Sequence, residues 1–74
     1  MATEVNQGYE IIKCMRVGNI EFVLGHNPKA PEPYVTWKRD FGTKNYYYGN
    51  YFVDEKRALR NLKQRVHREK SYER

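Results

Sequence analysis

The sequence predicts an α+β domain in which an antiparallel sheet of three to four strands, built from two hairpins, packs on one C-terminal α-helix. Short segments rich in β-branched and aromatic residues alternate with turn-forming residues, and helix formers dominate from residue 54 onward. A chain of 74 residues is long enough for one core only. The helix is expected to cover one face of the sheet and to leave the other face free for solvent or a partner.

The first two predicted strands, residues 9–16 and 20–24, form a hairpin. Ile20, Phe22 and Leu24 occupy alternate positions, so they share one face of the sheet. Gly18 and Asn19 have the composition of a two-residue hairpin turn, where positive φ is needed. We expect this hairpin to follow a disordered tail over residues 1–8.

Residues 25–33 contain all three prolines, so they are predicted to form a loop. A second hairpin follows, with strands over residues 34–39 and 46–53 and a turn over residues 40–45. Gly49 and Asn50 interrupt its last strand, which indicates a β-bulge or a close approach of another group to the backbone.

The predicted helix begins after Asp54, which has the chemistry of an N-cap. It is expected to reach about residue 70, with residues 71–74 frayed, so that a single ββββα domain spans residues 9–70. Its apolar stripe is narrow, which suits a helix lying on a sheet. The stripe consists of Ala58, Leu59, Leu62 and Val66.

The net charge of +5 is concentrated at the C-terminal end of the chain. Residues 1–53 carry six basic and five acidic side chains, whereas residues 54–74 carry eight basic and four acidic ones, a net of +4. Such a field attracts polyanions or acidic protein surfaces. The same charges can also be a solvated helix face, so both interpretations stay open.

Candidate catalytic and metal-binding residues are few. Cys14 is the single cysteine, and His26 and His67 are far apart in the sequence. This set predicts no disulfide, no metal site, no cofactor and no enzyme. A small domain without disulfides favours the cytoplasm. No segment approaches the roughly 20 apolar residues that a membrane-spanning helix needs.

Aromatic and basic residues alternate on the second hairpin. Cations there can neutralise phosphates while rings contact bases or sugars, and a two-stranded ribbon fits the major groove of DNA. Alternation also places half of residues 46–52 in the core, and Trp37 could be the main filler of that core. With the helix cations included, the candidate binding residues are Trp37, Lys38, Arg39, Lys44, Tyr47, Lys56, Arg60 and Lys63.

Gly49 and Tyr51 belong to an aromatic-Gly-x-aromatic element, and Ala58 is an early alanine in the following helix. In these features the C-terminal half resembles the three-stranded-sheet-plus-helix DNA-binding domains of transposon integrases and of plant ethylene-response factors. The resemblance implies that the sheet face away from the helix enters the major groove. It implies that this face presents Arg39, Lys44 and Tyr47 to DNA, with Trp37 as a further candidate.

Residues 9–12, 21–25, 33–37 and 47–51, together with Arg65, also resemble short uncharacterised accessory proteins of bacterial mobile elements and phages. That resemblance implies an accessory role such as DNA handling, regulation or inhibition of a host defence nuclease.

Two functions follow as hypotheses. The first is a non-enzymatic nucleic-acid-binding protein, monomeric or homodimeric, with duplex DNA as the expected partner. The second is an inhibitor or adaptor that binds an acidic protein surface, for example an anti-CRISPR-like protein. Its interface would use exposed tyrosines and arginines or an open edge of the sheet.

Overall fold

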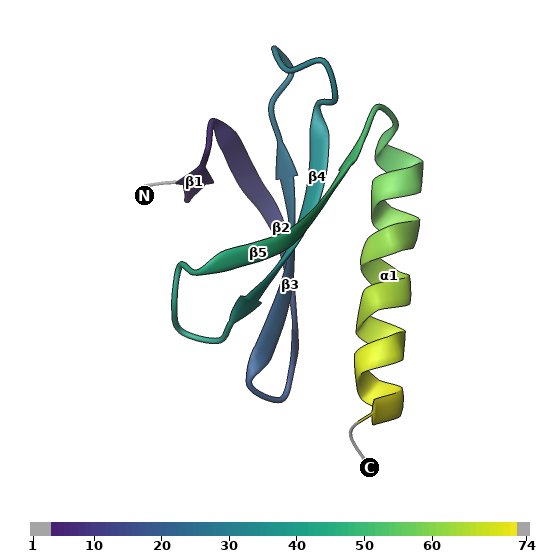
Figure 1. Cartoon of the computed structure of the whole chain (residues 1–74). Coiled ribbons are helices and arrows are strands. Elements are labelled where there is room, and N and C mark those ends of the chain that lie inside the picture. The colour runs from purple at the N-terminus through teal and green to yellow at the C-terminus, as the bar shows by residue number, and fades with distance from the viewer. Residues whose placement is uncertain (1–3, 73–74) are drawn as a thin grey trace.

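Five antiparallel strands and one long helix make up the computed structural model, which describes residues 4–72, the last of them in its backbone alone. The elements are β1 (Val5–Asn6), β2 (Tyr9–Val17), β3 (Ile20–His26), β4 (Tyr34–Asp40), β5 (Tyr46–Phe52) and α1 (Glu55–Tyr72). The strands pair in sequence order, and α1 lies along one side of the twisted sheet (Figure 1). The predicted α+β class is confirmed, with five strands in place of three to four.

The additional strand, β1, lies in the segment predicted as a disordered tail. Val5 pairs with Glu10, and Asn6 pairs with Tyr9. Gln7 and Gly8 form the turn between the strands, with φ of 52° and 84°. Positive φ at both central residues is the geometry of a type I′ hairpin turn. Residues 1–3 of the predicted tail lie outside the described residues.

The two predicted hairpins are present. Val17 pairs with Ile20 across Gly18, whose φ is 60°. The proline loop between the hairpins is closed by a backbone hydrogen bond of 2.8 Å from Asn27 N to Pro33 O. The second hairpin turns at Gly42, which has φ of 81°.

The helix begins as predicted. The Asp54 carboxylate accepts a hydrogen bond of 3.0 Å from the backbone N–H of Lys56, which otherwise has no partner within the helix. The helix continues to Tyr72, so Ser71 and Tyr72 are helical although the sequence predicted fraying there. Residues 73–74 lie outside the described residues.

One core lies between the sheet and α1. Phe22 and Leu24 of β3 and Val17 of β2 point toward the helix, as the alternation along β3 predicted. They meet the apolar stripe of the helix, in which Ala58 and Leu62 are fully buried. The predicted stripe is therefore the packing face of α1, and the opposite face of the helix is left to solvent.

The sheet face away from the helix was expected to be free, and the structure corrects this expectation. A second group of buried residues fills its centre, and we call it the aromatic cluster. Its members are Tyr9, Val23, Val35 and Trp37. The Tyr9 and Trp37 rings meet edge to face with centroids 5.7 Å apart. The middle of this face is thus a small core of its own.

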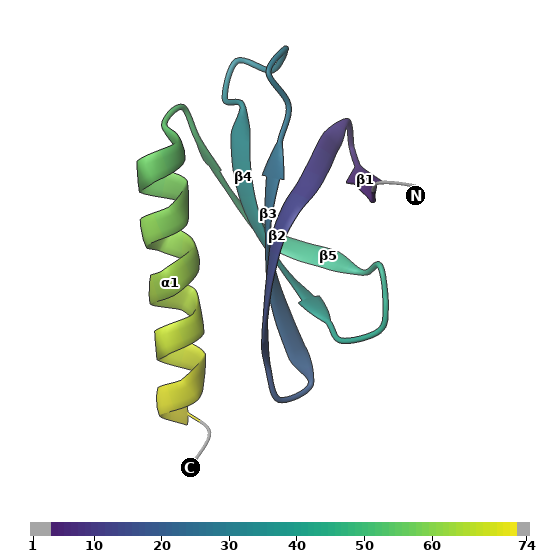
Figure 2. The same ribbon diagram turned by 180° about the vertical axis from the view of Figure 1, so that it is seen from behind.

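Curling of the sheet closes the aromatic cluster. Strands β2 and β5 are separated by two other strands, yet the rings of Tyr9 on β2 and Tyr51 on β5 have centroids 5.9 Å apart. The strong twist that allows this contact is visible from behind in Figure 2. A flat sheet would keep these two strands well apart.

A β-bulge lies where β5 passes Trp37. Tyr47 pairs with Lys38 and Asn50 pairs with Thr36, so Tyr48 and Gly49 together oppose the single residue between them. A Cβ atom on Gly49 would lie 2.8 Å from Nε1 of Trp37. The sequence predicted a bulge or a close approach here, and both are present.

Candidate binding surface

The cations of β4, which were candidates for contacting phosphate, are engaged within the protein. Arg39 is 8% exposed. Its Nε donates a hydrogen bond of 2.9 Å to Oε1 of Glu21, and its Nη1 donates to Oε2 of Glu4. Nη1 also donates to the Tyr46 hydroxyl at 2.9 Å. With two carboxylates on one guanidinium, Arg39 offers no free charge to a ligand.

The surroundings of Arg39 hold it in the charged form. Burial alone would lower the pKa of Arg39, but the hydrogen bond to Glu21 and the charges of Glu21 and Glu4 outweigh burial and raise it. The neighbouring Cys14 thiol has a pKa raised by burial, which the charge of Arg39 only partly offsets. A thiol of raised pKa is a weak nucleophile at neutral pH.

The other candidates on the second hairpin lie in different environments. Trp37 is 3% exposed and belongs to the aromatic cluster, which is the core position that the sequence left open. Lys38 points to the opposite face, where its Nζ lies 3.6 Å from Oε1 of Glu69. The Tyr47 hydroxyl donates to Oδ1 of Asp40 at 2.8 Å. Lys44 is exposed in the turn and has no ion pair within residues 4–72.

The helix candidates differ from those of β4. Lys56, Arg60 and Lys63 are all exposed, and none forms an ion pair within the described part of the chain. Together with His67 and Lys70 they repeat every three or four residues, so they follow one side of the helix. At 1.5 Å per residue, the row from Lys56 to Lys70 is about 21 Å long. The lysines and the arginine of this row are available to an extended anion.

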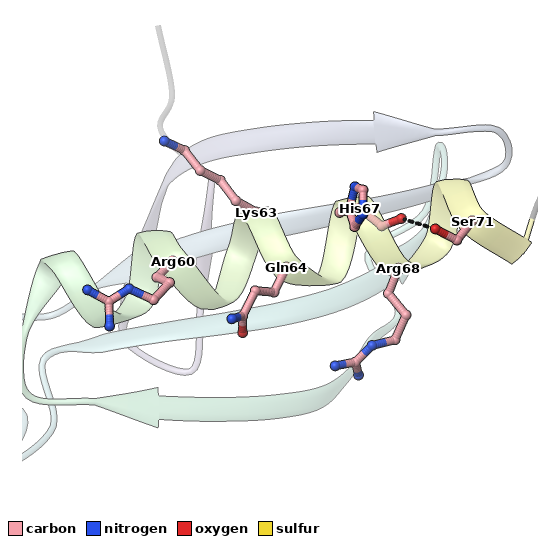
Figure 3. Close-up of a pocket in the computed structure, with 6 residues that line it drawn as sticks. All are labelled: Arg60, Lys63, Gln64, His67, Arg68 and Ser71. Atoms are coloured by element: carbon pink, nitrogen blue, oxygen red, sulfur yellow. Dashed lines mark hydrogen bonds between the residues drawn. The ribbon is translucent and has the colours of Figure 1, made fainter.

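A hollow of about 790 Å³ lies on this outer face of α1 (Figure 3). All of its lining residues come from the single helix, so it is an open trough between long side chains rather than a pocket with opposing walls. A trough of this kind suits a charged chain lying across it better than an enclosed small molecule. Its lining residues are Arg60, Lys63, Gln64, His67, Arg68 and Ser71.

Three residues that the sequence did not place among the candidates lie at the edge of this surface and beyond it. Arg68 lines the trough, Arg65 donates a hydrogen bond to the Tyr48 carbonyl on β5, and Tyr48 itself is 70% exposed. The pKa of Arg65 is lowered, first by burial and then by the charge of Arg68. Helical spacing alone could have indicated that Arg65 and Arg68 are neighbours, because they are three residues apart.

Among residues 4–72, no group of three or more His, Cys, Asp or Glu side chains could hold a metal ion. The described chain also contains no helix that is long and apolar enough to cross a membrane. Comparison of the chain with protein-family models, curated proteins and solved structures found no match.

Proposed function

We propose that this chain is a small, non-enzymatic nucleic-acid-binding protein that contacts phosphates through the outer face of α1. The observation that carries the proposal is the row of exposed cations without internal partners, Lys56, Arg60 and Lys63 with Lys70. Cations of this kind release condensed counterions when they neutralise phosphates, which supplies most of the affinity of non-specific binding. An accessory role on a mobile element is part of this proposal.

The interface in this proposal differs from the one that the sheet-plus-helix DNA-binding domains imply. In those domains the sheet face away from the helix enters the major groove. Here that face carries buried Trp37 and the ion-paired Arg39. The helix is the element with accessible positive charge, so we assign the phosphate contacts to it and not to the ribbon of β4 and β5.

Fluorescence polarisation with labelled duplex DNA, single-stranded DNA and RNA tests the proposal. We expect binding at low salt, with the logarithm of the affinity falling linearly with the logarithm of salt concentration. The double variant Arg60→Gln, Lys63→Gln should weaken binding and make the slope shallower by about 0.9 per lost contact on duplex DNA. Absence of binding to all three nucleic acids would refute the proposed function.

A matched control removes the same charge elsewhere. Arg16 on β2 and Lys29 in the proline loop are exposed, and Arg16 pairs with Glu21 on the sheet face away from α1. The double variant Arg16→Gln, Lys29→Gln should keep most of the affinity. If both double variants lost the same affinity, net charge rather than the helix face would determine binding.

The alternative function, an inhibitor or adaptor that binds an acidic protein surface, could use the same cations. Strand addition to β5 is less favoured, because the bulge at Tyr48 and Gly49 breaks the regular edge. Capture of a protein partner that survives nuclease treatment, by a chain that binds no nucleic acid, would favour this alternative.

A further inference from the structure

Tyr48 has a backbone conformation that its residue type disfavours. Its φ is 57°, in the left-handed region, where the Cβ of an L-residue crowds the backbone. It is the first residue of the bulge opposite Trp37, and Gly49 follows it. Glycine would adopt this φ without strain, so the choice of tyrosine at position 48 has no advantage for the backbone.

The conformation of Tyr48 is held in place from the helix. Nη2 of Arg65 donates a hydrogen bond to the Tyr48 carbonyl, and Nη1 of Arg65 donates to the Thr36 carbonyl at 3.2 Å. Arg65 thus ties the bulge of β5 to β4 and to α1. Strained residues that are fixed in this way are concentrated at binding sites.

The ring that this backbone presents is exposed. Tyr48 is 70% accessible to solvent, while its ring contacts Tyr47 edge to face with centroids 5.1 Å apart. The Tyr47 ring is fixed in turn by its hydrogen bond to Asp40. An aromatic ring that is fixed by its neighbours and open to solvent is a surface on which a flat group can stack.

One cation lies near this ring, and two further cations line a hollow together with it. Nζ of Lys38 lies 6.0 Å from the Tyr48 ring centroid. Lys38 also lines a hollow of about 200 Å³ with Arg65, Arg68, Glu69 and Phe22. Three cations face one carboxylate there, and Arg68 also lines the trough on the outer face of α1. Arg68 therefore connects the helix trough with a hollow lined by Lys38, which lies near the Tyr48 ring, and by Arg65, which binds the Tyr48 carbonyl.

We infer that Tyr48 is a stacking site for an unpaired nucleobase, and that the nucleic acid bound along α1 is single-stranded. The inference rests on the proposed function and deepens it. The phosphates cross the trough on the outer face of α1 as far as Arg68, which lines both hollows, and one base extends from that end of the chain to lie on the Tyr48 ring. A base paired within a duplex is already stacked and cannot reach this ring.

The test compares an oligothymidine with an abasic oligonucleotide of the same length, each labelled for polarisation. The protein should bind oligothymidine more tightly than the abasic chain and more tightly than duplex DNA. Tyr48→Gly should weaken binding of oligothymidine by roughly 5- to 150-fold, the range for one stacked base. Its binding of the abasic chain should stay unchanged. Tyr48→Phe keeps the ring and should bind as the natural protein does.

Tyr48→Gly suits this test because glycine tolerates the left-handed φ, so removal of the ring is not expected to disturb the fold. Trp37 is the only tryptophan, and its unchanged emission would confirm this. Should the emission shift, Tyr48→Asn is the second variant, because Asn also accepts this conformation.

The inference is overturned if Tyr48→Gly binds oligothymidine as tightly as the natural protein. It is also overturned if Tyr48→Gly loses equal affinity for both oligonucleotides, or if the natural protein prefers the duplex. In each of these cases, an effect of Arg60→Gln, Lys63→Gln would leave the proposed function standing. Absence of binding to any nucleic acid would remove both.

Discussion

Strand β4 and helix α1 both carry cations next to aromatic or apolar residues, but the two elements use them differently. On β4, Arg39 is enclosed by Glu4, Glu21 and Tyr46, and Lys38 faces Glu69. On α1, Lys56, Arg60 and Lys63 face solvent without carboxylate partners in the described chain. The comparison shows that a basic residue is available to a ligand only when the fold places no carboxylate of the same chain beside it.

The largest expected effect concerns Arg39. Arg39→Met would leave the Glu4 and Glu21 carboxylates without their shared cation, and we expect the free energy of unfolding to fall by about 3 kcal/mol. Urea unfolding followed by Trp37 emission measures this loss. Lys63→Met on the helix is the matched control and should leave unfolding unchanged. Equal stability of the two variants would contradict the distinction between β4 and α1.

The next effect tests whether the far face of β4 is closed. Gly49→Ala places a methyl carbon only 2.8 Å from Nε1 of the Trp37 indole, which is closer than two such atoms can approach without a shift. We expect a loss of about 1–3 kcal/mol in unfolding free energy, together with a shift in Trp37 emission. Gly42→Ala is a control for the emission alone: its φ of 81° strains an alanine, but no atom lies within 4 Å of the new methyl group, so the Trp37 emission should stay unaltered. An unshifted emission in Gly49→Ala would mean that Trp37 is not enclosed there.

The third prediction, with a smaller effect, removes the carboxylate partner of a β4 cation. That cation, Lys38, should then be as available for binding as the cations of α1. Glu69→Gln removes the carboxylate that lies 3.6 Å from Lys38, and both side chains are only about one quarter exposed. Because such pairs contribute up to about 1 kcal/mol, we expect binding of single-stranded DNA to tighten by roughly two- to five-fold at low salt. Polarisation measures the change, and unchanged binding would show that Lys38 does not contact the nucleic acid.

The smallest effect is a dependence of stability on alkaline pH. Burial, followed by the charges of Tyr51 and Glu32, raises the pKa of Tyr9 above its ordinary value of 10.0. Above pH 10 the unfolded chain therefore loses this proton while the folded protein keeps it, so stability falls as pH rises toward the folded pKa. Tyr9→Phe should reduce this fall in urea unfolding series.

Tyr47 provides the control for the alkaline series. A hydrogen bond to Asp40, and then burial, raises the pKa of Tyr47, so this residue contributes in the same direction. Tyr47→Phe should leave the contribution of Tyr9 in place. A pH series that Tyr9→Phe does not alter would contradict the burial of Tyr9 in the aromatic cluster.

Local chemistry explains how much of the fold was predictable. The turn at Gly18, the proline loop, the bulge at Gly49 and the Asp54 cap each depend on residues adjacent in sequence, and all four were predicted. Strand β1 was missed because its turn begins with Gln7, a residue type that seldom adopts positive φ. Trp37 was a candidate for the core, but the aromatic cluster on the face away from the helix was missed, because it depends on curling of the whole sheet, which period-two alternation does not reveal.

The candidate site was predictable to a similar degree. Helical spacing placed Lys56, Arg60 and Lys63 on one exposed arc, which the structure retains. The role of Arg39 could not be anticipated, because its partner Glu4 lies 35 residues away in the segment predicted as a tail. The exposed ring of Tyr48 depends on its backbone conformation and on the bulge register, and neither follows from the order of three consecutive tyrosines.

The bulge at Tyr48 and Gly49 has a consequence for self-association. Strand β5 forms an edge of the sheet and contains no charged residue, a composition that invites edge-to-edge aggregation. Counting from the turn, only Tyr46 and Tyr47 pair with β4 before the bulge interrupts the ladder of hydrogen bonds. A second chain could therefore not continue the sheet along all of β5. The backbone irregularity that exposes the Tyr48 ring also breaks the regular edge that a neutral, tyrosine-rich strand would otherwise offer to a second chain.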